Sequence, residues 1–137
     1  HDRAMMANIR SKDTSPEIVL RRALHRKGLR YRLHVAKIPG RPDLVFPRFR
    51  AAVFVHGCFW HRHPDCRYAT TPATRTEFWQ AKFDATVARD MRNQRDLAET
   101  GWRVGIVWEC TIKKRKIGDL TDEVHTWLNG DESNLEV

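Results

Sequence analysis

Residues 54–66 read Phe-Val-His-Gly-Cys-Phe-Trp-His-Arg-His-Pro-Asp-Cys, and this stretch decides the fold and the function that the sequence predicts. Three histidines and two cysteines stand within it, interleaved with two large aromatic side chains. A hydrophobic core rarely holds polar side chains at that density, because each one needs a hydrogen-bond partner when it is buried. The stretch is instead typical of a loop that binds a metal ion, transfers protons and contacts a flat ligand.

The chain contains three cysteines, Cys58, Cys66 and Cys110. An odd number of cysteines, with no secretory signal, argues against a disulfide framework and favours metal ligation in a reducing compartment. Cys58, His63 and Cys66 follow the spacing C-x4-H-x2-C. Cys110 follows a predicted strand that can neighbour the strand before residue 58, and a Cys3His set of this kind is typical of structural zinc. His61 also lies between the two cysteines, so the spacing leaves open which histidine binds zinc.

Basic residues outnumber acidic ones by 25 to 17, which gives a formal net charge of +8. They concentrate between residues 21 and 32 and again between residues 113 and 116. Such a surface favours polyanions, chiefly nucleic acid, although a solvated helix face would have the same composition. No apolar run approaches the roughly 18 residues that a membrane-spanning helix requires. We therefore expect a nucleic-acid-binding protein of the cytoplasm.

The pattern of apolar residues predicts one α/β domain over residues 1–137, with a mixed central sheet flanked by helices. Thr14 and Glu17 form a capping-box pattern at the start of the first helix, and Gly28 ends it. The further elements expected are a half-buried strand over 29–35, paired strands over 43–46 and 51–55, a helix over 74–99, a strand over 102–108 and a helix over 119–128.

Several positions in these elements carry specific expectations. The apolar face of the first helix should comprise Val19, Leu20, Ala23 and Leu24. The inward positions of the long helix should include Phe78, Phe83, Val87, Met91 and Leu97. Residues 1–12 and 131–137 are expected to be loose ends, the first of them a flexible arm.

Asp43 opens an apolar strand, and the next strand ends at His56. An acid in this position occurs in metal-dependent nucleases of the PD-(D/E)xK type, where oxygen ligands hold Mg²⁺. The second strand, residues 51–56, lacks the usual Glu-x-Lys, so histidines would have to transfer the protons. A simple Pro-Asp turn would also explain Asp43 taken alone.

Phe59 and Trp60 lie between the candidate zinc ligands. Large rings on a loop either pack beneath the metal or wedge between base pairs of DNA. Trp79, at the start of the long helix, is either a core residue or a third wedge, and its spacing does not decide between them.

Together these residues resemble the very-short-patch repair (Vsr) DNA mismatch endonucleases, over nearly the whole chain. The string His-Gly-Cys-Phe-Trp-His at 56–61 is the most specific part of the resemblance. The other matching strings are Met-Ala-Asn-Ile-Arg at 6–10, Pro-Gly-Arg-Pro-Asp at 39–43, Pro-Ala-Thr-Arg-Thr-Glu-Phe-Trp at 72–79, Gly-Trp-Arg-Val at 101–104 and Val-Trp-Glu-Cys at 107–110.

The resemblance implies a restriction-endonuclease-like fold with a structural Zn²⁺ and a catalytic Mg²⁺. It implies a nick in one DNA strand on the 5′ side of the T in a T·G mispair, which arises by deamination of 5-methylcytosine. Mismatch-repair proteins are possible partners, and a monomer suits an asymmetric mispair. Two alternatives remain: a restriction or nicking enzyme of the same fold that acts on matched duplex, and a non-catalytic zinc module that binds DNA.

Carried over by motif, the resemblance gives individual residues roles. Asp43 and the main-chain carbonyl of Val55 would hold Mg²⁺. His61 would be the general acid and base, oriented by Asp90, and His56 would be a second catalytic histidine. Zinc would be bound by Cys58, His63, Cys66 and Cys110. DNA would be contacted by Met6, Phe59, Trp60, Trp79 and Lys82.

Overall fold

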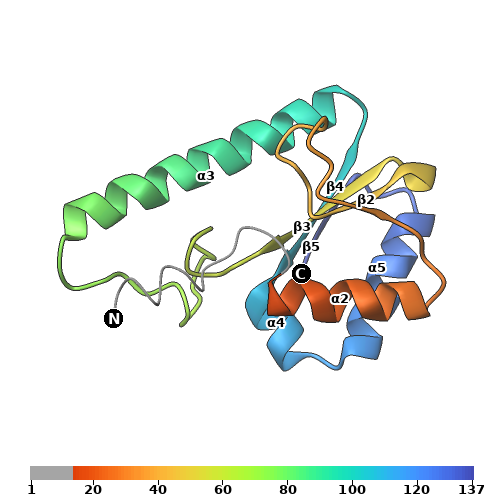
Figure 1. The fold of residues 1–137 in the computed structure, drawn as a ribbon, viewed down its shortest axis with the longest axis horizontal. Coiled ribbons are helices and arrows are strands. Elements are labelled where there is room, and N and C mark those ends of the chain that lie inside the picture. The colour runs from red at the N-terminus through yellow and green to blue at the C-terminus, as the bar shows by residue number, and fades with distance from the viewer. Residues whose placement is uncertain (1–13) are drawn as a thin grey trace.

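The computed structural model describes residues 14–137. Figure 1 shows a central sheet with helices on both sides of it. The elements are α2 (Ser15–Arg26), β1 (Arg32–Leu33), β2 (Leu44–Phe46), the 3-10 turn η1 (Pro47–Phe49), β3 (Ala51–His56), α3 (Thr76–Glu99), β4 (Arg103–Trp108), α4 (Glu109–Lys114), α5 (Ile117–Asn129) and β5 (Asn134–Glu136). The expected α/β class is confirmed.

The sheet has the strand order β1-β2-β3-β4-β5. β1, β2 and β3 pair antiparallel, as the predicted paired strands require, whereas β3, β4 and β5 pair parallel. Parallel neighbours need a crossover connection, and α3 supplies the one between β3 and β4. The register pairs His56 with Trp108, so β3 and β4 end side by side. Side chains that follow the two strands are thereby brought together.

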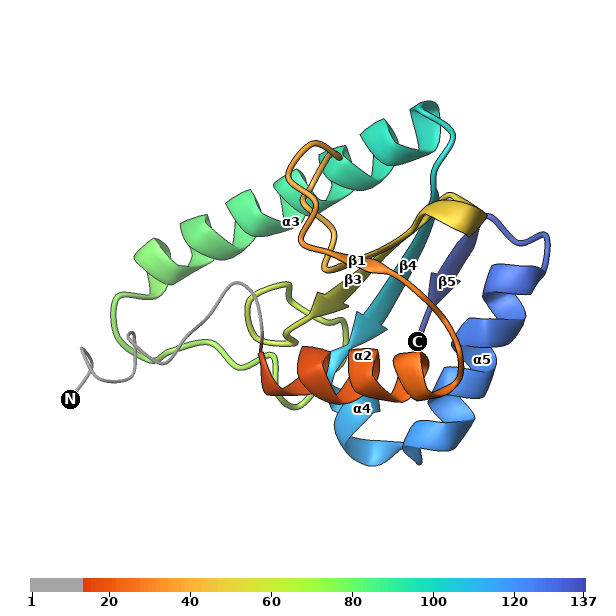
Figure 2. The same cartoon turned by 45° about the vertical axis from the view of Figure 1, so that its right-hand side comes forward.

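The two faces of the sheet have separate hydrophobic cores, because side chains alternate along each strand. The helices α2, α4 and α5 cover one face (Figure 2). Its buried side chains include Leu20, Leu24, Leu44, Phe46, Val53, Val107, Ile112, Leu120, Val124 and Leu128. The C-terminal part of α3 covers the other face, where Leu97 packs with Ala52, Phe54, Val104 and Ile106.

The helix α3 extends past the ends of the strands (Figure 1). Phe83 and Leu97 are buried as predicted, and Val87 is half-buried. The prediction for Phe78 and Met91 was wrong, since their exposed fractions are 40% and 66%. The pattern of apolar residues suggested a helix packed along its whole length, but the sheet reaches only its C-terminal part.

The first helix begins after Thr14, as expected, but the capping box was wrong. Thr14 makes no side-chain cap hydrogen bond. The Glu17 side chain is 1% exposed and bonds instead to Arg21 and His34. On the same helix Leu20, Ala23 and Leu24 are buried, whereas Val19 is 45% exposed.

Three further expectations need correction. The predicted strand over 29–35 is reduced to the two residues of β1, both exposed. Residues 131–137 are not a loose end, because β5 adds a parallel edge strand beside β4. The short helix α4 was missed, since six residues are too few for a clear helical period. The predicted N-terminal arm over 1–12, with Met6, lies outside the described residues. Across residues 14–137, no helix has the length and apolar character to cross a membrane.

Candidate active site and metal centre

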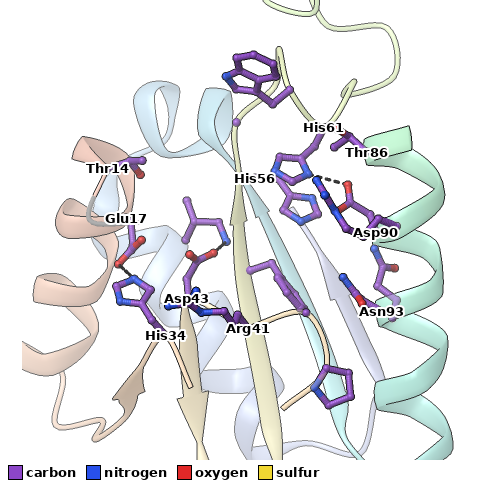
Figure 3. A pocket seen from close by; sticks show the side chains of 18 of the residues that line it. Thr14, Glu17, His34, Arg41, Asp43, His56, His61, Thr86, Asp90 and Asn93 are labelled. Carbon is purple, nitrogen blue, oxygen red and sulfur yellow. Dashed lines mark hydrogen bonds and ion pairs between the residues drawn. The ribbon is translucent and has the colours of Figure 1, made fainter. Parts of the chain in front are cut away.

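A cleft of about 1230 Å³ opens where β3 ends. Its walls come from the start of α2, the segment 34–43, the loop after β3 and the middle of α3. Two groups of polar side chains face each other across it in Figure 3. Glu17, His34 and Asp43 form the first group, and His56, His61 and Asp90 form the second.

Asp43 lies immediately before β2, beside the end of β3. Its Oδ2 accepts a hydrogen bond from the Val55 main-chain N–H at 2.7 Å. Burial raises the pKa of the Asp43 carboxyl above its ordinary value, the Val55 hydrogen bond opposes the rise, and the Glu17 carboxylate adds to it. A buried carboxylate beside a second one favours a bound cation, so this donor set fits a hard divalent ion.

The turn before Asp43 fits tightly against the opposite wall of the cleft. Gly40 has φ +83°, and a Cβ built on it would lie 3.0 Å from side-chain atoms of Phe54 and Asn93. Glycine is therefore required here both for the backbone conformation and for the close approach. The turn at residues 39–42 thus fixes where Asp43 enters the site.

Glu17 is a site residue that the sequence reasoning missed. Its Oε2 lies 2.8 Å from His34 Nε2 and 2.7 Å from an Arg21 guanidinium nitrogen. The ligand atoms of Glu17, His34 and Asp43 all lie within 4.8 Å of one another. The Thr-x-x-Glu pattern pointed to a local cap, and only the fold brings Glu17 to Asp43.

The histidines of the second group stack on each other. The rings of His56 and His61 are 3.8 Å apart and almost parallel, at 4°. His61 Nδ1 lies 2.6 Å from Asp90 Oδ2 on α3. Burial lowers the pKa of His56 to about 3, and the nearby His61 adds to this effect while Asp90 opposes it. His56 is therefore a neutral ring that packs against His61, and the Asp90 carboxylate orients His61.

The candidate zinc residues also come together. The ligand atoms of Cys58, His63, Cys66 and Cys110 lie within 4.8 Å of one another. His63 Nδ1 is 3.4 Å from Cys110 Sγ and 3.7 Å from Cys58 Sγ. Three thiols and one imidazole form a donor set that suits a closed tetrahedral zinc site. Burial raises the pKa of the Cys58 thiol, and a bound cation would reverse that shift.

Two residues outside the predicted set support this metal centre. The His63 ring stacks on the Trp108 indole at 4.2 Å and 11°. Trp108 Nε1 in turn donates to Glu136 Oε2 at 2.9 Å, in the C-terminal strand β5. The orientation of the candidate ligand therefore depends on a strand that the sequence did not predict.

The aromatic residues form one cluster at the edge of the cleft. Phe59 lies 5.1 Å from Trp60 and 5.9 Å from Trp79, as measured between ring centroids. Phe83 supports the cluster from α3, at 5.1 Å from Phe59. Phe83 is buried, whereas the other three rings are half-buried and keep part of their surface accessible. Lys82 is exposed nearby, with Nζ 5.4 Å from the Phe78 ring centre.

Arg62 stabilises this loop, although no pattern in the sequence pointed to it. Its guanidinium lies 3.8 Å from the Phe83 ring centre. It donates hydrogen bonds to the carbonyls of Phe59, Ala69 and Thr70, and to Thr71 Oγ1, at 2.9 to 3.1 Å. One side chain thus ties the aromatic cluster to the chain that follows the candidate zinc residues.

Similarity to known proteins agrees with this arrangement. A family model described as DNA mismatch endonuclease Vsr matches residues 1–68. The chain is 42% identical over 144 residues to the DNA mismatch endonuclease Vsr of Escherichia coli (strain K12), covering 100% of this chain and 92% of that protein. It is 48% identical over 110 residues to the type II nicking enzyme V.XorIIP of Xanthomonas oryzae pv. oryzae, covering 80% of each chain.

A further relative is the type II nicking enzyme V.NaeI of Lentzea aerocolonigenes, which is 37% identical over 139 residues, or 98% of this chain and 82% of that protein. One of the three relatives is a DNA mismatch endonuclease by name, and the other two are nicking enzymes by name. Because the whole chain aligns with one of them at 42% identity, it belongs to the Vsr family of DNA mismatch endonucleases and is an endonuclease of DNA repair.

Proposed function

We propose that the protein is a Mg²⁺-dependent endonuclease that nicks one strand of duplex DNA on the 5′ side of the T in a T·G mispair. The nick would begin short-patch repair of deaminated 5-methylcytosine. We further propose a restriction-endonuclease-like fold braced by structural zinc, acting on DNA as a monomer. The proposed mispair specificity is supported by the match to the family model and by the 42% identity to a relative named a DNA mismatch endonuclease.

The observation that carries the proposal is the proximity, within residues 56–61, of a stacked histidine pair and two aromatic side chains. The stacked histidines His56 and His61 lie beside the cleft, and Phe59 and Trp60 join the aromatic cluster only a few residues away. Rings that wedge into a base step would thereby fix the position of the histidines relative to the phosphate backbone.

Asp43 and the main-chain carbonyl of Val55 would hold the Mg²⁺ ion. The ion supplies two effects when bound: it lowers the pKa of an attacking water, and it offsets negative charge on the phosphate. The 2.7 Å hydrogen bond from Val55 to Asp43 supports this assignment, because it keeps the carboxylate beside the main chain of β3.

His61 would move the proton during hydrolysis. Its contact with Asp90 favours a proton on Nδ1, which makes Nε2 the nitrogen that can take up or release a proton. Asp90 would also fix the ring orientation, and His56 would support it by stacking. A positioned acid or base of this kind typically contributes about 10²–10⁴-fold to the rate.

Zinc bound by Cys58, His63, Cys66 and Cys110 would brace the loop that carries both functions. The closed donor set supports a structural role, since four protein ligands leave no place for water. Phe59, Trp60 and Trp79 would open the DNA stack from one groove, with Met6 as a further candidate in the undescribed arm. Lys82 is a candidate for contact with the mispair.

Two relatives named type II nicking enzymes raise a second candidate function, which is nicking of matched duplex. Nicking rates on one duplex, made with a T·G, a T·A or a C·G pair at the same position, test the proposal. We expect Mg²⁺-dependent nicking of the T·G duplex alone. Equal rates on all three duplexes would favour the second candidate.

A further inference from the structure

One side of the cleft carries an imidazole beside two carboxylates. Glu17 comes from α2, His34 from the segment after β1 and Asp43 from the residue before β2. Figure 3 shows the three side chains on the same wall of the cleft. Their ligand atoms lie within 4.8 Å of one another, a spacing that a single divalent cation can bridge.

The backbone holds His34 in this position. His34 has a left-handed conformation, with φ 48°, which is uncommon for a residue other than glycine. Its main-chain N–H donates to the Asp43 carbonyl at 3.2 Å. The same residue therefore contacts Glu17 through its ring and Asp43 through its backbone, so the ring is fixed relative to both carboxylates.

The charges around the cluster suit a cation. Arg21 lies 2.7 Å from Glu17 and offsets its charge, whereas Asp43 accepts a hydrogen bond from the neutral Val55 main-chain N–H and lies beside the Glu17 carboxyl. His34 Nε2 lies 2.8 Å from Glu17 Oε2, so a ring nitrogen and a carboxylate oxygen that could bind one ion already lie side by side.

We propose that Glu17, His34 and Asp43 bind one divalent cation together, and that the His34 nitrogen makes this site favour Mn²⁺ over Mg²⁺. The inference rests on the proposed function, in which Asp43 is a ligand of the catalytic ion. Mg²⁺ strongly prefers oxygen ligands and retains its water. Mn²⁺ also favours oxygen ligands, but as a first-row transition metal it accepts a nitrogen donor more readily than Mg²⁺ does. Replacing one oxygen donor by an imidazole therefore shifts preference toward Mn²⁺.

The test measures cation binding directly. Mn²⁺ is titrated into the protein and followed by the electron paramagnetic resonance signal of the free ion, and Mg²⁺ affinity is obtained by competition. Both titrations are repeated with a T·G duplex that carries a non-cleavable linkage at the nick site. In the wild-type protein, we expect Mn²⁺ to bind more tightly than Mg²⁺ by about tenfold or more.

His34→Gln keeps a side chain that can hydrogen-bond Glu17 but removes the imidazole. We expect it to lower the ratio of Mn²⁺ to Mg²⁺ affinity by about tenfold, with Mg²⁺ affinity changing much less. His125→Gln, on α5 and outside the cleft, is the matched control and should leave the ratio unchanged. Glu17→Gln should weaken both ions, which keeps the site testable if the His34 variant folds poorly.

An unchanged ratio in folded His34→Gln would overturn the inference, and so would Mn²⁺ binding that survives Asp43→Asn. Absence of Mn²⁺ binding with and without the duplex would overturn it as well. Nicking of the T·G duplex by the wild-type protein in Mg²⁺ is scored separately. If the wild-type protein nicks the T·G duplex but His34→Gln leaves the affinity ratio unchanged, the proposed function stands and this inference fails. If His34→Gln lowers the ratio but the wild-type protein does not nick the T·G duplex, this inference stands and the proposed function fails.

Discussion

At the scale of single residues, Asp43 is the group on which the proposed chemistry depends most. Asp43→Asn preserves the shape and the acceptor for the Val55 N–H but removes the charge that would hold the cation. We expect single-turnover nicking to fall by roughly 10³-fold, since a catalytic metal contributes several kcal/mol. Binding to the T·G duplex should change little, because phosphate contacts elsewhere supply most of the affinity.

Asp131→Asn is the control, since Asp131 is exposed on the loop between α5 and β5. Nicking by that variant should equal nicking by the wild-type protein. If Asp43→Asn nicks at the wild-type rate, Asp43 does not hold the catalytic ion.

His56 provides a prediction about stability and pH. Burial lowers its pKa to about 3 in the folded protein. The unfolded chain takes up a proton at this residue below about pH 6.5, whereas the folded protein stays neutral there. The contribution of His56 to the free energy of unfolding should therefore fall as the pH drops from about 6.5 toward 3, by up to about 1.4 kcal/mol per unit.

His56→Gln removes this titrating group. Urea unfolding of both proteins should show the wild type losing about 2 kcal/mol more than the variant between about pH 7 and 5. Curves that stay parallel across that range would mean that His56 is protonated in the folded state.

Glu17 shows where sequence reasoning at this scale fails. Thr14 and Glu17 match the capping-box pattern, and the helix does begin after Thr14. The actual partner of Glu17, His34, and its neighbour Asp43 lie far along the chain, so no local pattern reveals them. Asp43, His56 and His61 could be predicted because the motif itself is local, whereas the pairing of His61 with Asp90 came from the family resemblance alone.

At the scale of elements, the loop between β3 and α3 depends on residues from three other elements, α4, β4 and β5. Cys110 comes from α4, and Trp108 at the end of β4 stacks on His63. The sequence predicted that Cys110 would join the other ligands if the strands before residues 58 and 110 are neighbours, and β3 and β4 do pair. It did not predict β5, whose Glu136 holds Trp108, since three residues carry too little apolar signal.

Cys110→Ser should release the zinc ion that we propose for this site. A serine hydroxyl is a much poorer ligand than a thiolate, so the three remaining ligands should hold the ion weakly. Metal analysis of the purified variant should give well under one zinc per chain, with unfolding at a lower temperature than for the wild type. A content of one zinc per chain in the purified variant would refute the ligand set.

Substitution of Arg62 tests whether side-chain hydrogen bonds stabilise the loop in addition to the proposed metal ion. Arg62→Met retains an apolar stem against Phe83 but loses the hydrogen bonds to the carbonyls of Phe59, Ala69 and Thr70. We expect a loss of about 2–3 kcal/mol in the free energy of unfolding, with zinc retained.

Arg67→Met is the matched control, because Arg67 is exposed and its guanidinium lies 5.2 Å from the Tyr68 ring centre. It should cost less than about 0.5 kcal/mol. Equal effects of the two substitutions in denaturant titrations would contradict the role given to Arg62.

At the scale of the whole molecule, helices cover the two faces of the sheet to different extents. One face is closed by α2, α4 and α5, and the other is partly covered by α3, which extends past the strands (Figure 2). The cleft and the aromatic cluster lie at that extension. Phe78 and Met91 are exposed, although the pattern of apolar residues in α3 predicted that both would be buried. The prediction failed because the sheet ends before the helix does.

The central claim is that this fold directs a nick to one side of a single mispair. The direct measurement uses a duplex with one T·G pair, labelled in turn at the end of each strand, and maps the products after incubation with protein and Mg²⁺. We predict one break, in the strand that carries the T and on its 5′ side, with the G strand and the matched T·A duplex intact. Breaks in both strands, or equal cleavage of the matched duplex, would contradict the account.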